Sequence, residues 1–131
     1  MLKTLFVTAI VGLFLFFSAS QTSAQWKNLG SKEVTDRAES DVFHVSSFKG
    51  QFRALRFNVS RRPIRFYRME VTYGNGERNE IEIRDLIPAG GKSRVIDLPG
   101  KDRYISRVKF WYEAASIGSG KRSYITLWGR K

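Results

Sequence analysis

The sequence predicts an all-β fold, an antiparallel β-sandwich or jelly roll of seven to eight strands that follows a cleaved signal peptide. Apolar and polar residues alternate with a period of two in most segments between Trp26 and Arg130. Turn residues, mainly Gly, Pro and Asn, separate these segments. Because no segment combines length with helical periodicity, we expect strands throughout.

Residues 1–24 have the anatomy of a secretory signal peptide. Lys3 supplies a positive start, the run from Leu5 to Phe17 is apolar, and Thr22-Ser23-Ala24 offers small residues for cleavage before Gln25. The apolar run has 13 residues, short of the roughly 20 that span a bilayer. We therefore expect cleavage rather than an anchor, no later transmembrane segment, and a periplasmic or secreted protein.

Residues 25–131 are expected to form one β-sandwich domain of 107 residues, enough for one modest core. They contain no cysteine, so packing must hold the domain together without disulfides. Removing Lys3 from the 23 basic residues leaves 22 against 12 acidic ones, a net charge of +10. Such a charge favours anionic surroundings, and it also keeps a small domain soluble.

The first strands follow from alternation and turn chemistry. Trp26–Val34 reads as an opening strand with a kink or bulge at Gly30. Val42–Val45 is a short strand, and Phe52–Ser60 alternates cleanly. Arg61-Arg62-Pro63 ends that strand because proline cannot donate to a ladder.

Ile64–Tyr73 and Arg78–Asp85 form the best-defined hairpin. A three-residue loop, Gly74-Asn75-Gly76, places Met69 opposite Ile81 and Arg68 opposite Glu82. A register shifted by one residue would set polar side chains against apolar ones. We also expect a bulge near Phe66 or Tyr67, where the alternation changes phase.

The second half of the chain continues the pattern. Leu86–Gly91 is expected to be a loop and Ser93–Leu98 a strand that Pro99-Gly100 ends. Arg103–Tyr112 and Ser123–Arg130 follow as two strands joined by the connection from Glu113 to Arg122. If these two strands pair with Tyr112 opposite Ser123, Trp111 lies opposite Tyr124, and Arg107 opposite Trp128.

In that pairing one face of the last two strands belongs to the core, and the other is basic and aromatic. Each aromatic side chain there would present roughly 150–250 Å² of surface. Together they could approach or exceed the largest exposed apolar patch of an ordinary monomer. Either the opening strand around Trp26 covers these rings, or a ligand does. The predicted ligand-binding residues are Arg107, Lys109, Trp111, Tyr124 and Trp128.

The residue types argue against enzyme chemistry, a metal site or a cofactor. With no cysteine and one histidine, His44, neither a cysteine nucleophile nor a zinc site can be built. The acidic run from Asp36 to Asp41 lacks the glycine of a dedicated calcium loop. Glu70, Glu80 and Glu82 share one face of the hairpin, but interleaved arginines would neutralise them and leave a solvated charge ladder.

An arginine cluster allows two interpretations. It comprises Arg53, Arg56, Arg61, Arg62, Arg65 and Arg68. Guanidinium groups bind phosphate, sulfate and carboxylate in a bidentate manner, but positive side chains on strand edges and turns also prevent aggregation. Both interpretations stay open. No nucleic-acid-binding motif accompanies the cluster, and we expect no nucleic-acid partner.

The pattern Arg103-x-Ile105-x-x-Val108-x-Phe110-x-Tyr112, with Ile125-x-Leu127-x-Gly129 and the opening Trp26-x-x-Leu29-Gly30, resembles an uncharacterised family of small exported bacterial β-sandwich proteins. The resemblance implies a sandwich fold and a periplasmic location. It implies no catalytic residues, because the shared motifs are packing motifs.

These observations favour an exported, non-enzymatic module that binds an anionic envelope or extracellular polymer, of glycan or lipopolysaccharide type, through its basic aromatic face. Rings would stack on sugar faces, and cations would meet phosphate or carboxylate groups. The alternative is a protein–protein interaction or self-assembly module of the cell envelope. Both functions would use the same face. Either is possible only if that face is exposed and is not covered by the chain itself.

Overall fold

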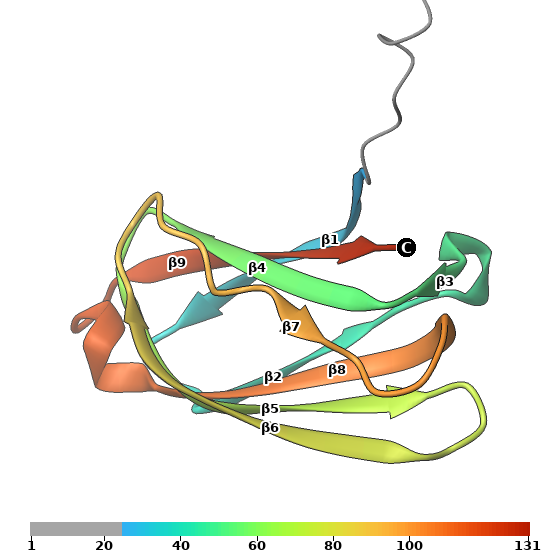
Figure 1. The fold of residues 1–131 in the computed structure, drawn as a ribbon. Helices are drawn as coiled ribbons and strands as arrows, with labels where there is room; N and C mark the ends of the chain where they lie inside the picture. The colour runs from blue at the N-terminus through green and yellow to red at the C-terminus, as the bar shows by residue number, and fades with distance from the viewer. Residues whose placement is uncertain (1–24) are drawn as a thin grey trace, which may run out of the picture.

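A computed structural model describes residues 25–131, which form two antiparallel sheets that face each other (Figure 1). The predicted signal peptide lies outside the described residues. Within them, no helix has the length and apolar character needed to cross a membrane. The predicted all-β sandwich is confirmed.

The described chain has nine strands, one more than the upper limit predicted, because two of them have only two residues each. The strands are β1 (Trp26–Thr35), β2 (Ser40–His44), β3 (Gln51–Phe52), β4 (Ala54–Ser60), β5 (Ile64–Tyr73), β6 (Arg78–Ile87), β7 (Ile96–Asp97), β8 (Arg103–Glu113) and β9 (Arg122–Arg130). Two short 3₁₀ helices, η2 (Ser47–Lys49) and η3 (Ala114–Ile117), occupy connections.

The first sheet has the order β1-β9-β4-β7, and the second has β2-β8-β5-β6, with β3 pairing the beginning of β8. β8 and β9 therefore lie in different sheets, and the predicted hairpin between them is wrong. In Figure 1 the chain leaves β8 in the lower layer and returns along β9 in the upper one. The connection packs Ala114 and Ile117 into the interior, which a solvent-exposed hairpin loop would not do.

The aromatic core joins the two sheets. Phe57 on β4 meets Phe66 on β5 and Phe110 on β8 edge to face, with ring centroids 4.7 and 4.8 Å apart. All three side chains are fully buried. Edge-to-face pairs add to the free energy gained from apolar burial, so this cluster fixes how the first sheet lies over the second.

The β5–β6 hairpin has the predicted register. Met69 pairs with Ile81 and Arg68 with Glu82. The Tyr73 amide donates to the Glu77 carbonyl at 2.9 Å, which closes a three-residue loop. The register also shifts between Phe66 and Arg68, where a bulge is predicted.

The predicted strand Ser93–Leu98 is mostly irregular, because only Ile96 and Asp97 form a strand. Ser93 supplies the reason, since its buried hydroxyl accepts from the Phe57 amide at 3.1 Å. The Ser93 amide donates to the Phe57 carbonyl at 2.8 Å. A side chain thus replaces one bond of the strand ladder. The predicted loop from Leu86 begins later than expected, because β6 continues to Ile87.

Gly129 on β9 is required by the packing of Phe52. A Cβ atom at Gly129 would lie 2.7 Å from the Phe52 ring and 3.0 Å from Leu29. We predict that Gly129→Ala lowers the free energy of unfolding by about 1–3 kcal/mol, the usual cost of overpacking a core. Thr126→Ala, on the outer face of the same strand, should cost less. Urea denaturation measures both, and equal losses would contradict the packing argument.

Tyr112 gives the fold a sensitivity to alkaline pH. Its buried hydroxyl donates to Asp41 on β2 at 2.9 Å. Burial, as the larger cause, and the neighbouring Asp41 carboxylate both raise the pKa of Tyr112 well above its usual value. An unfolded tyrosine loses its proton near pH 10, whereas folded Tyr112 keeps it. The stability that this difference provides is therefore present below about pH 10 and is lost as the pH rises further.

We predict that the free energy of unfolding falls less steeply above about pH 10 in Tyr112→Phe than in the wild type. The two slopes against pH should differ by up to the contribution of one titrating proton. Urea denaturation between pH 8 and pH 11 measures the slope. Tyr104→Phe is the control, because Tyr104 is exposed. If the wild type and Tyr112→Phe show the same slope, Tyr112 does not carry the effect.

Candidate functional site

The structure divides the predicted binding residues between two opposite faces. Arg107, Lys109 and Trp111 lie on β8, on the outer face of the second sheet. Tyr124 and Trp128 lie on β9, on the outer face of the first sheet. The single five-residue platform that a β8–β9 hairpin would create is therefore not formed, and the two faces differ in character.

On the second sheet, Trp111 is half-buried and lies beside cations of its own chain. The Arg68 guanidinium lies 4.1 Å and the Lys109 ammonium 4.7 Å from the Trp111 ring centroid. Arg68 pairs with Glu80 at 3.4 Å, and Lys109 has Glu70 as its neighbour on β5. Both cations thus make cation–π contacts with this ring, and Arg68 is also paired with a carboxylate.

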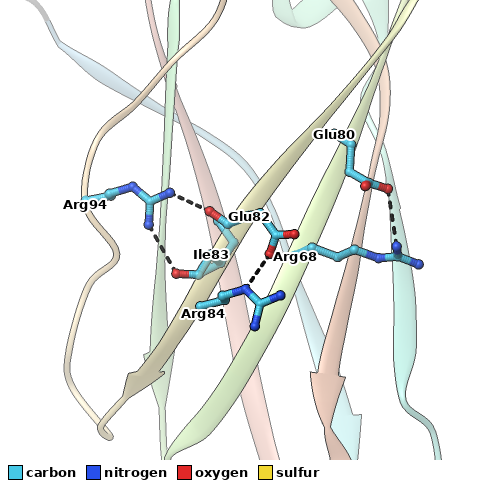
Figure 2. A network of polar contacts seen from close by, with 6 residues as sticks. All are labelled: Arg68, Glu80, Glu82, Ile83, Arg84 and Arg94. Carbon is cyan, nitrogen blue, oxygen red and sulfur yellow. Dashed lines mark hydrogen bonds and ion pairs between the residues drawn. The ribbon is translucent and has the colours of Figure 1, made fainter.

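Figure 2 shows how the charges beside this face are balanced. Glu82 pairs with Arg84 at 2.8 Å, although its register partner is Arg68. Arg94 donates to the carbonyl oxygens of Glu82 and Ile83 at 2.6 and 3.3 Å, and so covers the edge of β6. The second sheet therefore presents alternating charges of both signs.

The outer face of the first sheet contains a groove of about 310 Å³, here called the tryptophan groove. Its lining residues are Trp26, Arg56, Asn58, Gly90, Lys92 and Trp128. In β-sheet register Trp128 lies between Asn28 of β1 and Arg56 of β4. Lys92 reaches the groove from the β6–β7 connection, which forms a β-bridge with Asn58.

Neighbouring side chains orient both indole rings of the groove. The Trp128 indole N–H donates to the Asn58 side-chain oxygen at 2.6 Å. Arg56 and Arg130 lie 4.3 and 4.9 Å from the Trp26 ring centroid. The two tryptophans are half-buried, so their positions are fixed while part of each ring stays accessible.

The tryptophan groove is positively charged. None of its lining residues is acidic. Within residues 25–131, no ion pair engages Arg56, Lys92 or Arg130. Flat apolar rings beside cations without carboxylate partners can hold a ligand that has both an apolar face and negative charge.

Sequence reasoning found only one residue of the groove as a ligand-binding candidate, Trp128. Cover of the aromatic face by the strand around Trp26 was one of two alternatives, but β1 pairs with β9 edge to edge and adds a ring beside Trp128 instead. Arg56 was noted only within the arginine cluster. The groove follows from the order β1-β9-β4, which no local pattern specifies.

The structure also places the other residues that were considered for catalysis or metal binding. Residues 25–131 contain no group of three or more His, Cys, Asp and Glu side chains placed to hold a metal ion. His44 is exposed on β2, opposite Arg107. Glu70, Glu80 and Glu82 belong to the charged surface of the second sheet, where Glu70 pairs in register with Glu80.

We predict that Asn58→Ala loosens Trp128 and lowers the free energy of unfolding by about 1 kcal/mol, the net value of one hydrogen bond. Acrylamide quenching of fluorescence reports the looseness when Trp128 is the only tryptophan, after Trp26→Phe and Trp111→Phe. Quenching should increase in Asn58→Ala and stay low in Asn58→Asp, which keeps an acceptor. Unchanged quenching in Asn58→Ala would show that the hydrogen bond does not position the ring.

Comparisons with known proteins give a family and a distant structural likeness. AlgX of Pseudomonas aeruginosa matches with 18% identity and a TM-score of 0.47, covering 77% of this chain and 26% of that chain. The present chain thus spans about a quarter of the length of AlgX. No curated protein matches. The model of the family described as a domain of unknown function, DUF2541, matches residues 8–129, so the chain belongs to the DUF2541 family.

Proposed function

We propose that this protein is an exported, non-enzymatic module that binds an anionic envelope or extracellular polymer, of glycan or lipopolysaccharide type, in the tryptophan groove. The observation that carries the proposal is the pair Trp26 and Trp128 beside Arg56 and Lys92, with no acidic residue in the lining. The location, periplasmic or secreted, rests on the signal-peptide pattern before Gln25.

The groove matches such a polymer in shape and chemistry. Its volume of about 310 Å³ is at the lower end for ligand sites, so it suits one segment of a longer chain. Indole rings provide apolar area against sugar rings. The Arg56 guanidinium and the Lys92 ammonium provide charge for phosphate or carboxylate groups.

The lining also supports binding rather than catalysis. General acid–base chemistry uses a positioned His, Asp, Glu, Lys, Tyr or Cys with a suitable pKa. The groove has Lys92 alone of these types, and no carboxylate faces it. Two tryptophans, an amide and two cations are equipped to hold a ligand, and they lack a nucleophile with an adjacent base.

We predict that Trp26→Ala with Trp128→Ala weakens retention on immobilised lipopolysaccharide about tenfold or more, which corresponds to roughly 1.4 kcal/mol for the two rings. Trp111→Ala is the matched control, because it removes an indole from the opposite face. Retention at two salt concentrations measures the effect, and the melting temperature checks folding. Arg56→Ala with Lys92→Ala should make the remaining binding less dependent on salt.

Two results would refute polymer binding in the tryptophan groove. One is unchanged retention of the Trp26 and Trp128 double variant, and the other is an equal loss in Trp111→Ala. Self-assembly through the second sheet is the competing function, since its alternating charges allow two copies to face each other. Sedimentation of the mature chain would then show a dimer that depends on concentration and is lost in Trp111→Ala.

A further inference from the structure

A second cavity, of about 290 Å³, lies where β4 ends and β9 begins. We call it the arginine pocket, and its lining residues are Arg61, Arg62, Gly120, Lys121 and Arg122. Four of these five residues are cationic and none is acidic. Two of them come from the arginine cluster, and Lys121 and Arg122 lie just before and at the start of β9, so the fold unites charges that lie far apart in the sequence.

A buried serine fixes the backbone of this pocket. The Ser123 hydroxyl lies 2.7 Å from the carbonyl oxygens of Ser60 and of Arg62. It also accepts from the Arg62 amide at 3.3 Å. Because Ser123 has no exposed surface, these bonds tie the turn after β4 to the first residues of β9.

Arg62 is held with its guanidinium in place. Its Nε donates to the Ile117 carbonyl at 3.0 Å. A Cβ atom at Gly118 would lie 2.9 Å from Nη2 of Arg62, so the guanidinium rests against a glycine that has no side chain. One of the five N–H donors of Arg62 is thus used for position, and donors remain for a ligand.

Arg61 has a backbone conformation that favours glycine, with φ of +84°. Its guanidinium lies 5.6 Å from the Tyr124 ring centroid. Glycine would form the same turn at lower conformational cost, so the turn alone does not require an arginine. Backbone strain of this kind is concentrated at functional sites.

The charges of the pocket are largely uncompensated. Arg122 pairs with Glu33 at 3.5 Å, and the Tyr124 hydroxyl also donates to Glu33. Lys121 and Arg122 border a neighbouring cavity that contains Glu33 and Asp36. Within residues 25–131, no ion pair engages Arg61, Arg62 or Lys121.

We propose that the arginine pocket binds a multiply charged oxyanion of the phosphate class. Three cations without carboxylate partners favour a dianion or trianion over a single carboxylate. Arginine forks match the geometry of phosphate oxygens in a bidentate manner. The anion could be a soluble phosphate or the phosphate of a lipid headgroup. The proposal is independent of the tryptophan groove, because Trp128 lies six residues beyond Arg122 along β9, roughly 20 Å away.

Inorganic pyrophosphate at low ionic strength is the first probe, with binding measured by calorimetry on the mature chain. We expect saturable binding at one site. Arg61→Gly should weaken it about tenfold or more, as expected for the loss of a charged hydrogen-bond donor. Arg84→Gly is a matched control, because Arg84 also has a positive φ, of +43°, and lies on the second sheet.

The two glycine variants lose the same charge and place glycine at a positive φ, so their melting temperatures should both stay near that of the wild type. Arg84→Gly should keep the wild-type affinity for pyrophosphate. The double variant of Trp26 and Trp128 should also keep it, which separates this pocket from the proposed polymer groove.

Vesicles of phosphatidylcholine with and without phosphatidic acid distinguish the source of the phosphate. Cosedimentation that requires phosphatidic acid and is lost in Arg61→Gly would support a lipid phosphate. Pyrophosphate binding without vesicle binding would support a soluble phosphate. The proposal is overturned if the wild type shows no saturable binding of pyrophosphate, or if Arg61→Gly and Arg84→Gly weaken it equally.

Discussion

The passage of the chain from one sheet to the other between β8 and β9 is the constraint on which the surface of this protein depends. Buried Ile117 and Ala114 hold the connection against the end of the core, and Ser123 fixes the first residues of β9. The inner residues of the two strands therefore meet across the core. Their outer residues, Trp111 and Trp128, point in opposite directions. A hairpin at this place would have merged two surfaces that the fold keeps apart.

The separation gives the two faces different electrostatic characters. On the second sheet, Arg68 and Arg84 have glutamate partners, and Arg94 donates to the edge of β6. Lys32 has a similar role at the other open side of the sandwich, where it donates to the Val42 carbonyl on β2. These bonds protect edge strands that could otherwise pair with other chains. On the first sheet, the groove cations have no such function in the fold.

Sequence patterns predicted what depends on neighbours along the chain. The β5–β6 register followed from which side chains would face each other, because a shift by one residue exposes every apolar group. The kink or bulge at Gly30 was predicted because glycine inside a strand often marks one, and the register of β1 shifts between Asn28 and Gly30. The partner of β8 could not be predicted, since alternation tells which face of a strand is buried but not which sheet contains it. Trp26, Arg56 and Lys92 were consequently missed as one site.

The two proposed sites of the first sheet should respond differently to salt, and this difference follows from the residues that line them. The tryptophan groove combines rings with cations, so part of its binding energy comes from apolar area that salt does not screen. The arginine pocket has four cations and one nearby ring, Tyr124. Its affinity is therefore mainly electrostatic and falls with ionic strength. Since Tyr124 and Trp128 share the outer face of β9, an extended anionic polymer longer than roughly 13 Å would contact both, and at high salt its binding would keep mainly the share that the indole rings of the groove provide.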